Sequence, residues 1–324
     1  MIDSIGPNLV ILVVGLLVFV AVFFLIFLLA ERTSVKTQEV LRYAVFLGPA
    51  LLLLAIGLLY PAGRTVYLSF MNKSGQEFVG LENYIWAFTT PEIQIVIRNT
   101  FIWVIVVPIF ATIFGLAMAY LTDRMKFASI VKSLVFLPMA ISMVGASIIW
   151  RFVYTFQPDE EKTEIGLLSA IVEAFGGEPN NWLLDAPLNT FLLIAVMVWI
   201  QTGFSMVVLS AAMKAIPDDI QEAAMLDGAG QLKRFFQVTI PMIRASIVVV
   251  ITTTLIGTLK VFDIVRTMTG GNFSTSVVAN EMYTQAFRQL NYGTGSTLAV
   301  LLLIAIIPLI WYNIRQLRLE RTER

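Results

Sequence analysis

The stretch KAIPDDIQEAAMLDGAGQLKRFFQVTIP, residues 214 to 241, interrupts a chain that is otherwise strongly apolar. Pro217 stands where a helix can begin, and Asp218 and Asp219 follow at the positive end of that helix. Gly228 is a typical helix stop. The stretch therefore predicts a short helix outside the membrane. A second short helix follows in GQLKRFFQVTI and ends where Pro241 opens the next apolar segment.

The first of these helices has an unusually narrow apolar stripe, formed by Ile220, Ala223 and Ala224. Such a stripe is too small to anchor the helix in lipid or to build a core of its own. Alanine side chains permit the close approach of another surface. The residues alone favour an ordinary solvated loop with incidental alanines, and a contact helix is the alternative.

The composition places the chain in a bilayer. Hydrophobic residues make up 58% of the 324 residues, charged residues only 14%, and the mean hydropathy is +0.82. The chain has no Cys and no His, which excludes a disulfide framework, thiolate or imidazole metal sites, and a nucleophile paired with a histidine base. The 22 basic and 22 acidic residues balance, so the chain has no overall electrostatic footprint for nucleic acid.

Seven segments are long and apolar enough to span a membrane, since a hydrocarbon core of about 30 Å needs roughly 20 residues of helix. The first segment is predicted to be a retained helix and not a signal peptide, because its apolar run is too long and only Asp3 precedes it. Internal prolines are tolerated in spans because neighbouring groups satisfy the freed backbone. The segments run approximately over 9–30, 43–62, 99–121, 130–152, 189–213, 243–263 and 296–314.

The placement of basic residues predicts the orientation of these spans. The connections on one side, together with the C-terminal tail, hold 14 of the 22 Lys and Arg residues, and the other side holds 8. By the positive-inside rule the N-terminus is expected outside, with the 214–241 stretch and the tail in the cytoplasm. The outer connection 156–187 contains IGLLSAIVEAF, which predicts a short amphipathic helix, either a cap over the bundle or a binding element.

The EAAMLDGAG run followed by Ile240 and Pro241 resembles the EAA loop of ABC importer permeases. GLENY, IRNTFIWV, KSLVFLPMAISMVGASIIWRFVY, WIQTGFSM, KVFDIV and YGTGSTLAVLLL also occur in the order of the carbohydrate-importing group. The resemblance covers about residues 78–315 and is closest to the α-glucoside and glucosylglycerol type permeases, relatives of the maltose permease.

This resemblance implies an all-α membrane fold with a six-helix permease core and one extra N-terminal transmembrane helix. The expected divisions are the extra helix and linker (1–42), the first core span with its outer loop (43–92), the EAA-loop transmembrane domain (93–315), and a basic tail (316–324).

In the family the short EAA helix docks into a groove of a separate cytoplasmic ATPase. Glu222 is then expected to pair with a basic residue of that ATPase, and Gly228 to allow a tight turn against it. No G-x-x-x-x-G-K-[ST] pattern occurs in the chain, so ATP and Mg²⁺ are expected on the partner ATPase and no cofactor on this chain. The implied docking residues are Glu222, Ala223, Ala224, Asp227, Gly228 and Pro241.

The resemblance also implies the remaining partners and the activity. A second homologous permease, two ATPase subunits and an extracytoplasmic sugar-binding protein are expected to assemble with this chain in a bacterial inner membrane. The complex is expected to import a di- or oligosaccharide, an α-glucoside, by ATP-driven alternating access. The chain itself is expected to be a permease subunit and not an enzyme.

Matching the chain to the maltose permease without gaps gives a candidate sugar path. Gln201 is the best candidate for a hydrogen bond to a sugar hydroxyl, whereas Met and Phe at helical spacing are more often packing residues. Met and Ile stand where the maltose permease is more polar, and no large outer domain precedes the third span. The implied path residues are Met197, Trp199, Ile200, Gln201, Phe204, Met139, Met143, Gly257 and Lys260.

Lys260 and Asp263 lie near the outer end of a predicted span, where charged residues are costly and usually functional. The alternative is that they pair with each other or reach water.

Two rival classes are weaker. A secondary transporter would need ionisable groups near the middle of several spans, and almost none occur there. A membrane-bound transferase would want clustered carboxylates, for which the outer run PDEEKTE is the sole candidate.

Overall fold

The computed structural model describes residues 14, 15, 17, 21, 24, 35–123, 125–157 and 166–322, and its regular elements are helices. The predicted all-α fold class is therefore confirmed. The chain divides into two compact units, Met1–Tyr67 and Leu68–Arg324. The finer division into four segments stays a prediction.

The first unit contains a helical path through α2 (Val35–Leu54), a π-helical turn η1 (Ala55–Leu59) and α3 (Tyr60–Leu68). Within it, Phe46–Leu68 is long and apolar enough to cross a membrane, and none of its most apolar window is buried inside the chain. This matches the segment expected over 43–62. The helix expected over 9–30 lies almost wholly outside the described residues.

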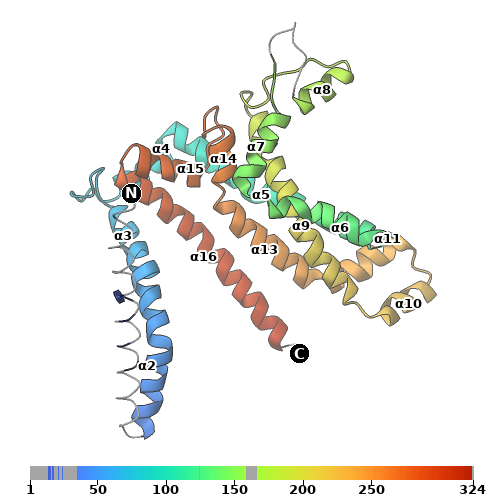
Figure 1. The fold of residues 1–324 in the computed structure, drawn as a ribbon, viewed down its shortest axis with the longest axis horizontal. Helices are drawn as coiled ribbons and strands as arrows, with labels where there is room; N and C mark the ends of the chain where they lie inside the picture. The colour runs from blue at the N-terminus through green and yellow to red at the C-terminus, as the bar shows by residue number, and fades with distance from the viewer. Residues whose placement is uncertain are drawn as a thin grey trace. The chain divides into compact units, whose positions relative to one another are not determined.

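Three long helices build the second unit: α5 (Pro91–Thr122), α9 (Leu188–Lys214) and α16 (Tyr292–Thr322). Helices α5 and α9 form the most extensive helix pair (Figure 1). Their backbones approach closely where a Cβ on Gly115 would lie only 2.3 Å from the Ser205 Cβ. Small residues at a helix crossing permit this approach, which is how membrane helices gain packing contacts.

One span is broken in its middle. Helix α6 (Ala128–Phe136) continues into the 3₁₀ turn η2 (Leu137–Ala140), and α7 (Met143–Val153) leaves at 103°. Pro138 lies in the 3₁₀ turn, and the Ser142 side chain accepts a hydrogen bond from the Gly145 N–H at 3.1 Å, which caps α7. The segment predicted over 130–152 is therefore a bent pair of helices.

The other broken span begins at the EAA-like stretch. Helix α11 (Gln231–Arg234) runs through the π-helical turn η3 (Phe235–Thr239) and α12 (Ile240–Met242), and α13 (Arg244–Leu259) follows at 70°. The expectation that the second short helix ends at Pro241 was wrong. The Ile240 N–H donates a hydrogen bond to the Phe235 carbonyl in the wide π-helical turn, so the helical run continues past Pro241. The break between the two helices lies at Ile243.

Four described helices are long and apolar enough to span a membrane, or six if each bent pair is one span. These six correspond to six of the seven predicted segments. The segment predicted over 243–263 ends earlier, because α13 stops at Leu259 and Lys260 follows as its C-cap.

Short helices cover one end of the second unit. They are α4 (Glu82–Thr89), α8 (Leu167–Ala174), α14 (Asp263–Met268), α15 (Val278–Tyr283) and the π-helical turn η4 (Thr284–Arg288). Helix α8 confirms the short amphipathic helix predicted in the 156–187 connection. Its Ser169 is buried and accepts a hydrogen bond from the Trp182 indole at 2.8 Å, whereas Leu167 is exposed.

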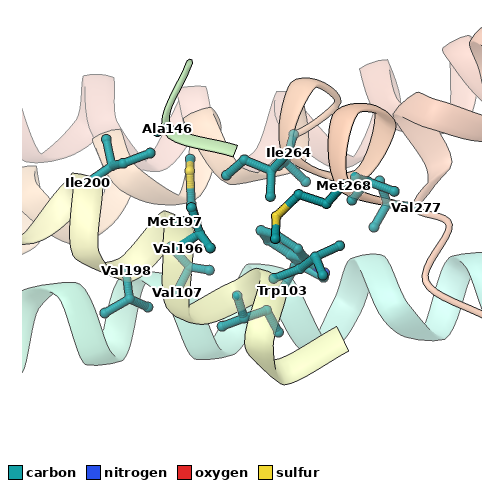
Figure 2. Close-up of a cluster of buried hydrophobic side chains, with 14 of the residues drawn as sticks. Trp103, Val107, Ala146, Val196, Met197, Val198, Ile200, Ile264, Met268 and Val277 are labelled. Atoms are coloured by element: carbon teal, nitrogen blue, oxygen red, sulfur yellow. The ribbon is translucent and has the colours of Figure 1, made fainter. Parts of the chain in front are cut away.

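The core lies where α5, α9, α7 and α14 meet (Figure 2). Trp103 of α5, Met197 of α9 and Ile264 of α14 are completely buried there. The core extends to the short helix α14, so the end of the bundle that carries α14 is packed as firmly as the spans.

Candidate functional site

Helix α10 (Asp218–Leu226) is the short helix predicted from the sequence, and its contact role stays a prediction. Pro217 is its N-cap, and Asp218 and Asp219 lie in its first turn. At its end the Ala229 N–H donates to the Ala224 carbonyl and the Gly228 N–H donates to the Met225 carbonyl, both at 3.0 Å. This is a Schellman ending, which requires a left-handed residue after the helix.

Gly228 occupies that left-handed position with φ +75°. A side chain there would strain the backbone by about 1–2 kcal/mol. The predicted helix stop is thus confirmed as a conformational requirement.

The surface around α10 is more apolar than the narrow alanine stripe indicated. Leu226 is 89% exposed and Leu232 is 72% exposed. Phe236 is exposed as well. We call Leu226, Leu232 and Phe236 the apolar rim of the α10 loop. Of the predicted docking residues on this helix and at its end, Glu222, Ala223 and Asp227 are exposed and Ala224 is partly buried.

Aromatic and polar contacts tie the loop to the bundle. The Phe235 ring lies 4.5 Å from the Tyr120 ring at the end of α5. Gln221 of α10 donates to the Thr239 hydroxyl at 3.3 Å. Gln221 thus links α10 to the helical run that leads into α13, and Phe235 links that run to α5. Pro241 lies in this run and not in the exposed loop.

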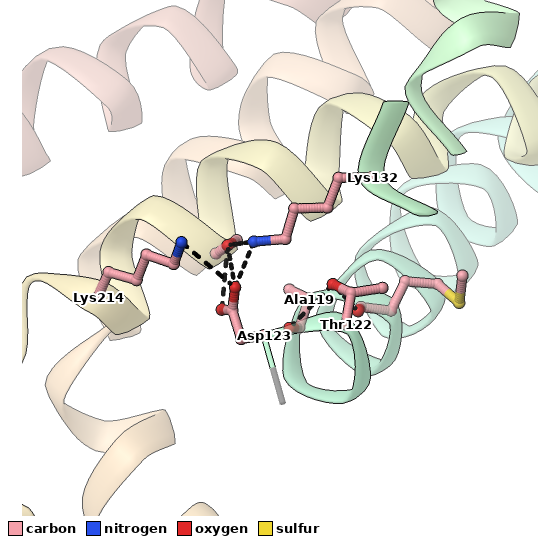
Figure 3. A network of polar contacts seen from close by, with 7 residues as sticks. Ala119, Thr122, Asp123, Lys132 and Lys214 are labelled. Atoms are coloured by element: carbon pink, nitrogen blue, oxygen red, sulfur yellow. Dashed lines mark hydrogen bonds and ion pairs between the residues drawn. The ribbon is translucent and has the colours of Figure 1, made fainter. Parts of the chain in front are cut away.

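A charged cluster joins three helices next to the loop (Figure 3). Asp123, directly after α5, forms an ion pair with Lys132 of α6. The Ser210 hydroxyl of α9 donates to both oxygens of Asp123 at 3.1 Å, and the Lys214 ammonium lies 3.6 Å from the carboxylate. The sequence offered no signal that these residues would meet.

The structure brings two of the predicted path residues together. A Cβ on Gly257 of α13 would lie 3.6 Å from the side-chain nitrogen of Gln201 of α9. Gln201 and Phe204 are both partly buried. Gly257 has no side chain to cover the Gln201 amide. This amide is therefore a suitable hydrogen-bond donor for a hydroxyl-rich solute.

The other predicted path residues differ in exposure. Met197 and Ile200 are 0% and 4% exposed and belong to the core in this conformation. Trp199 is partly buried, with its ring 5.6 Å from that of Trp150. Met143 packs against the same core, while Met139 and Lys260 are exposed. Their roles in a path stay predictions.

The structure separates the two charges near the end of α13. Lys260 caps α13, and Asp263 begins α14 after a two-residue connection. No ion pair joins these two described residues, so mutual pairing does not explain them. Both lie outside the spans that the structure defines.

A cavity of about 740 Å³ lies between α5, α6 and α9 and is almost entirely apolar. Trp199 and Thr202 line it, but Gln201 does not. One predicted path residue, Trp199, therefore faces this cavity, whose apolar lining matches lipid or a neighbouring chain better than a sugar.

Three buried asparagines were missed as structural residues, although two of them stand in the quoted motifs. Asn83 of GLENY donates to the Ser69 and Met71 carbonyls at 2.9 and 2.8 Å. Asn99 of IRNTFIWV donates to the Ser274 carbonyl at 2.6 Å, and Asn189 of α9 donates to the Phe273 carbonyl at 2.9 Å. These amides fix the loops at the end of the bundle opposite α10. In the sequence, the sign of this structural role was that each polar Asn stands within a largely apolar helical segment.

An apolar helical bundle with two broken spans and a protruding helix with an exposed apolar rim is the architecture of a membrane transport subunit that works with partners. Residues 84–321 match the family described as the binding-protein-dependent transport system inner membrane component, and the chain belongs to this family.

The chain is similar to the osmoprotective compounds uptake permease protein GgtC of Synechocystis, with 47% identity over 86% of this chain and 100% of that relative. It is 45% identical to the alpha-glucoside transport system permease protein AglF of Rhizobium meliloti, covering 87% of this chain and 84% of AglF. The trehalose/maltose permease protein MalF of Thermococcus litoralis is 28% identical.

A bacterial ABC transporter that imports the acidic polysaccharide alginate contains a chain of the same fold. The TM-score is 0.73 at 19% identity, and the match covers 87% of this chain and 96% of that one. This likeness supports the fold assignment. The family membership rests on the sequence matches.

Proposed function

We propose that this chain forms part of the translocation path of a binding-protein-dependent ABC importer for a di- or oligosaccharide of the α-glucoside type. A separate ATPase drives the import from the cytoplasm, and an extracytoplasmic binding protein delivers the sugar. A second, homologous permease completes the path. The observation that carries the proposal is the exposed Leu226 at the end of α10, the helix that matches the family's EAA motif, with Leu232 and Phe236 exposed in the run that follows.

The apolar rim supports a protein partner at this site. Leu226, at the end of the short helix α10 between two spans, is 89% exposed, and apolar side chains exposed outside the spans mark interaction surfaces. Glu222 adds an exposed carboxylate beside the rim. An exposed ion pair contributes only about 0–1 kcal/mol, so Glu222 sets the register while the rim supplies affinity.

The broken spans support alternating access. A two-state equilibrium moves from 1:99 to 99:1 when about 5.5 kcal/mol of differential binding is supplied. ATP binding to the partner provides this free energy at α10. The contacts from α10 to Thr239 and from Phe235 to Tyr120 carry the motion into the span that breaks at Ile243. Gln201 and Gly257 lie on the two helices, α9 and α13, that this motion separates.

The orientation follows from the same arrangement. The ATPase-binding loop is cytoplasmic, so the end of the bundle that carries α8 and α14 faces outward. The 14 Lys and Arg residues on the α10 side agree with the positive-inside rule. The N-terminus is then outside and the C-terminal tail is in the cytoplasm of the inner membrane.

Sugar uptake by cells with and without this chain tests the proposal. A panel of α-glucosides and glucosylglycerol is supplied to cells that express the partner subunits, and Leu226→Asp is compared with Leu167→Asp on exposed α8. We expect uptake and co-purification of the ATPase to be lost with Leu226→Asp alone.

Two results would contradict the proposal. Solute transport by the purified chain without any nucleotide-hydrolysing subunit favours a secondary transporter. Equal uptake by the two Asp variants removes the apolar rim from the docking surface.

A further inference from the structure

A polar pocket of about 560 Å³ opens between the end of α7, the segment before α9 and the loop after α14. Helix α9 has 27 residues and is therefore about 40 Å long at 1.5 Å per residue. The pocket lies at the beginning of α9 and α10 follows its end, so a hydrocarbon layer of about 30 Å fits between them. The pocket thus faces the side opposite the ATPase-docking loop.

The pocket carries positive charge. Arg151 of α7 and Arg266 of α14 both line it, and no carboxylate is among its described lining residues. The Arg266 guanidinium lies 5.1 Å from the centre of the Tyr283 ring, which holds it in place. Asn181 and Thr155 add polar groups. Planar guanidinium groups match the geometry of a carboxylate, and two of them lining one pocket attract an anion.

One wall of the pocket is held in a strained conformation. Phe273 lines the pocket with φ 55°, and Ser274 follows with φ 59°. Buried amides enforce this shape, because Asn189 donates to the Phe273 carbonyl at 2.9 Å and Asn99 donates to the Ser274 carbonyl at 2.6 Å. Strain in residues other than glycine persists where surrounding contacts over-determine it, and such sites cluster at binding clamps.

The floor of the pocket is closed. Tyr154 and Met268 line it, each is 4% exposed, and both belong to the hydrophobic core. The Tyr154 hydroxyl donates to the Leu192 carbonyl at 3.1 Å, and burial raises the pKa of this phenol, which keeps the donor protonated. The pocket therefore ends at the core and does not continue along α9 toward Gln201. A solute on its way through the membrane has no exit from it.

We propose that this pocket is a docking socket for an Asp or Glu side chain of the extracytoplasmic binding protein. The positive charge of the socket suits a carboxylate. Its rigid wall and closed floor suit a side chain that enters from the outer side and binds there. The inference rests on the proposed function, because it takes the binding protein as the partner on this face.

The experiment uses the complete transporter in proteoliposomes, with the sugar-loaded binding protein added at increasing concentration. ATPase activity is measured for the unchanged chain, Arg151→Glu, Arg266→Glu and the milder Arg151→Lys. Arg288→Glu is the matched control, because Arg288 is an exposed basic residue at the same end and does not line the pocket.

We expect each Glu variant to raise the half-saturating concentration of binding protein about tenfold or more, since reversing a charge at a docking surface slows association. The effect should shrink at high salt, where charges are screened. Arg151→Lys should show a smaller rise and Arg288→Glu none. Maximal activity at saturating binding protein should stay unchanged, which separates docking from misfolding.

Three results would overturn the inference. The Glu variants could behave as Arg288→Glu does, the maximal activity could fall with no change in half-saturation, or the half-saturating sugar concentration could rise at saturating binding protein. The last result assigns the pocket to the transported sugar. If the unchanged transporter shows no stimulation by the binding protein, the proposed function fails instead.

Discussion

Asp123 and Lys132 form an ion pair that joins the end of α5 to the first turns of α6, beside the α10 loop. Each side chain is only about one-fifth exposed. Ser210 donates to the same carboxylate, so α9 is held by the same group. One carboxylate thus holds three helices together at the end of the bundle where the partner ATPase is proposed to act.

Removing this carboxylate should loosen the cluster. Asp123→Asn leaves Lys132 partly buried without its counter-charge, so we expect a loss of about 1–3 kcal/mol in unfolding free energy. Thermal unfolding in detergent measures this as a fall of a few degrees in Tm. Glu92→Gln, an exposed carboxylate in the first turn of α5, is the control and should leave Tm unchanged. Equal midpoints for the two variants would refute a stabilising role.

The glycine that ends α10 should not tolerate a side chain. Gly228→Val forces a β-branched residue to φ +75°, which disrupts the Schellman ending and displaces the apolar rim. We expect ATPase co-purification and uptake to be lost while the chain still inserts into the membrane. Gly230→Ala is the matched control, because Gly230 has φ −63° and no atom within 4 Å of an added Cβ. Normal uptake by Gly228→Val would contradict the docking geometry.

The amide beside Gly257 should affect sugar handling alone. Gln201→Ala removes the donor from α9, so we expect the dependence of ATPase activity on sugar to weaken while the subunits stay associated. Thr202→Val is the neighbouring control, because Thr202 lines the apolar cavity on another face of the helix. Sugar-coupled ATPase activity in proteoliposomes distinguishes the two. An unchanged sugar dependence in Gln201→Ala removes this residue from the path.

The contact between α9 and the broken span should be sensitive to a single methyl group. A Cβ on Gly203 would lie 2.7 Å from the Val135 carbonyl oxygen, and both backbones are confined. Gly203→Ala should therefore cost about 1–3 kcal/mol through overpacking. Gly257→Ala, where the nearest atom is 3.6 Å away, should have a smaller effect. Thermal unfolding measures Tm for these two variants. Equal Tm values would show that α9 and the broken span do not pack tightly at Gly203.

The apolar segments and the docking helix were predictable from the sequence because each depends on local chemistry. Run length identified the described spans to within a few residues at most ends. Pro217 and Gly228 marked α10 because a proline starts a helix and a glycine accepts φ +75° whatever surrounds them. The EAA resemblance then predicted the family, which the sequence match confirmed.

The sequence did not predict which face of each span packs against the other helices. A membrane helix is apolar on every side, so periodicity does not tell which residues pack inward. Met197 and Ile200 were predicted beside the sugar and lie in the core of this conformation, whereas Gln201 lies beside Gly257.

Length, composition and local motifs thus determined that the chain crosses a membrane and that α10 begins after Pro217 and ends before Gly228. Only the tertiary structure decided that Asn99 would hold the backbone 175 residues away at Ser274, and that Arg151 and Arg266 would line one pocket. The physical reason is that such groups meet through the packing of whole helices, and the free energy of that packing depends on the complete arrangement and not on any one stretch.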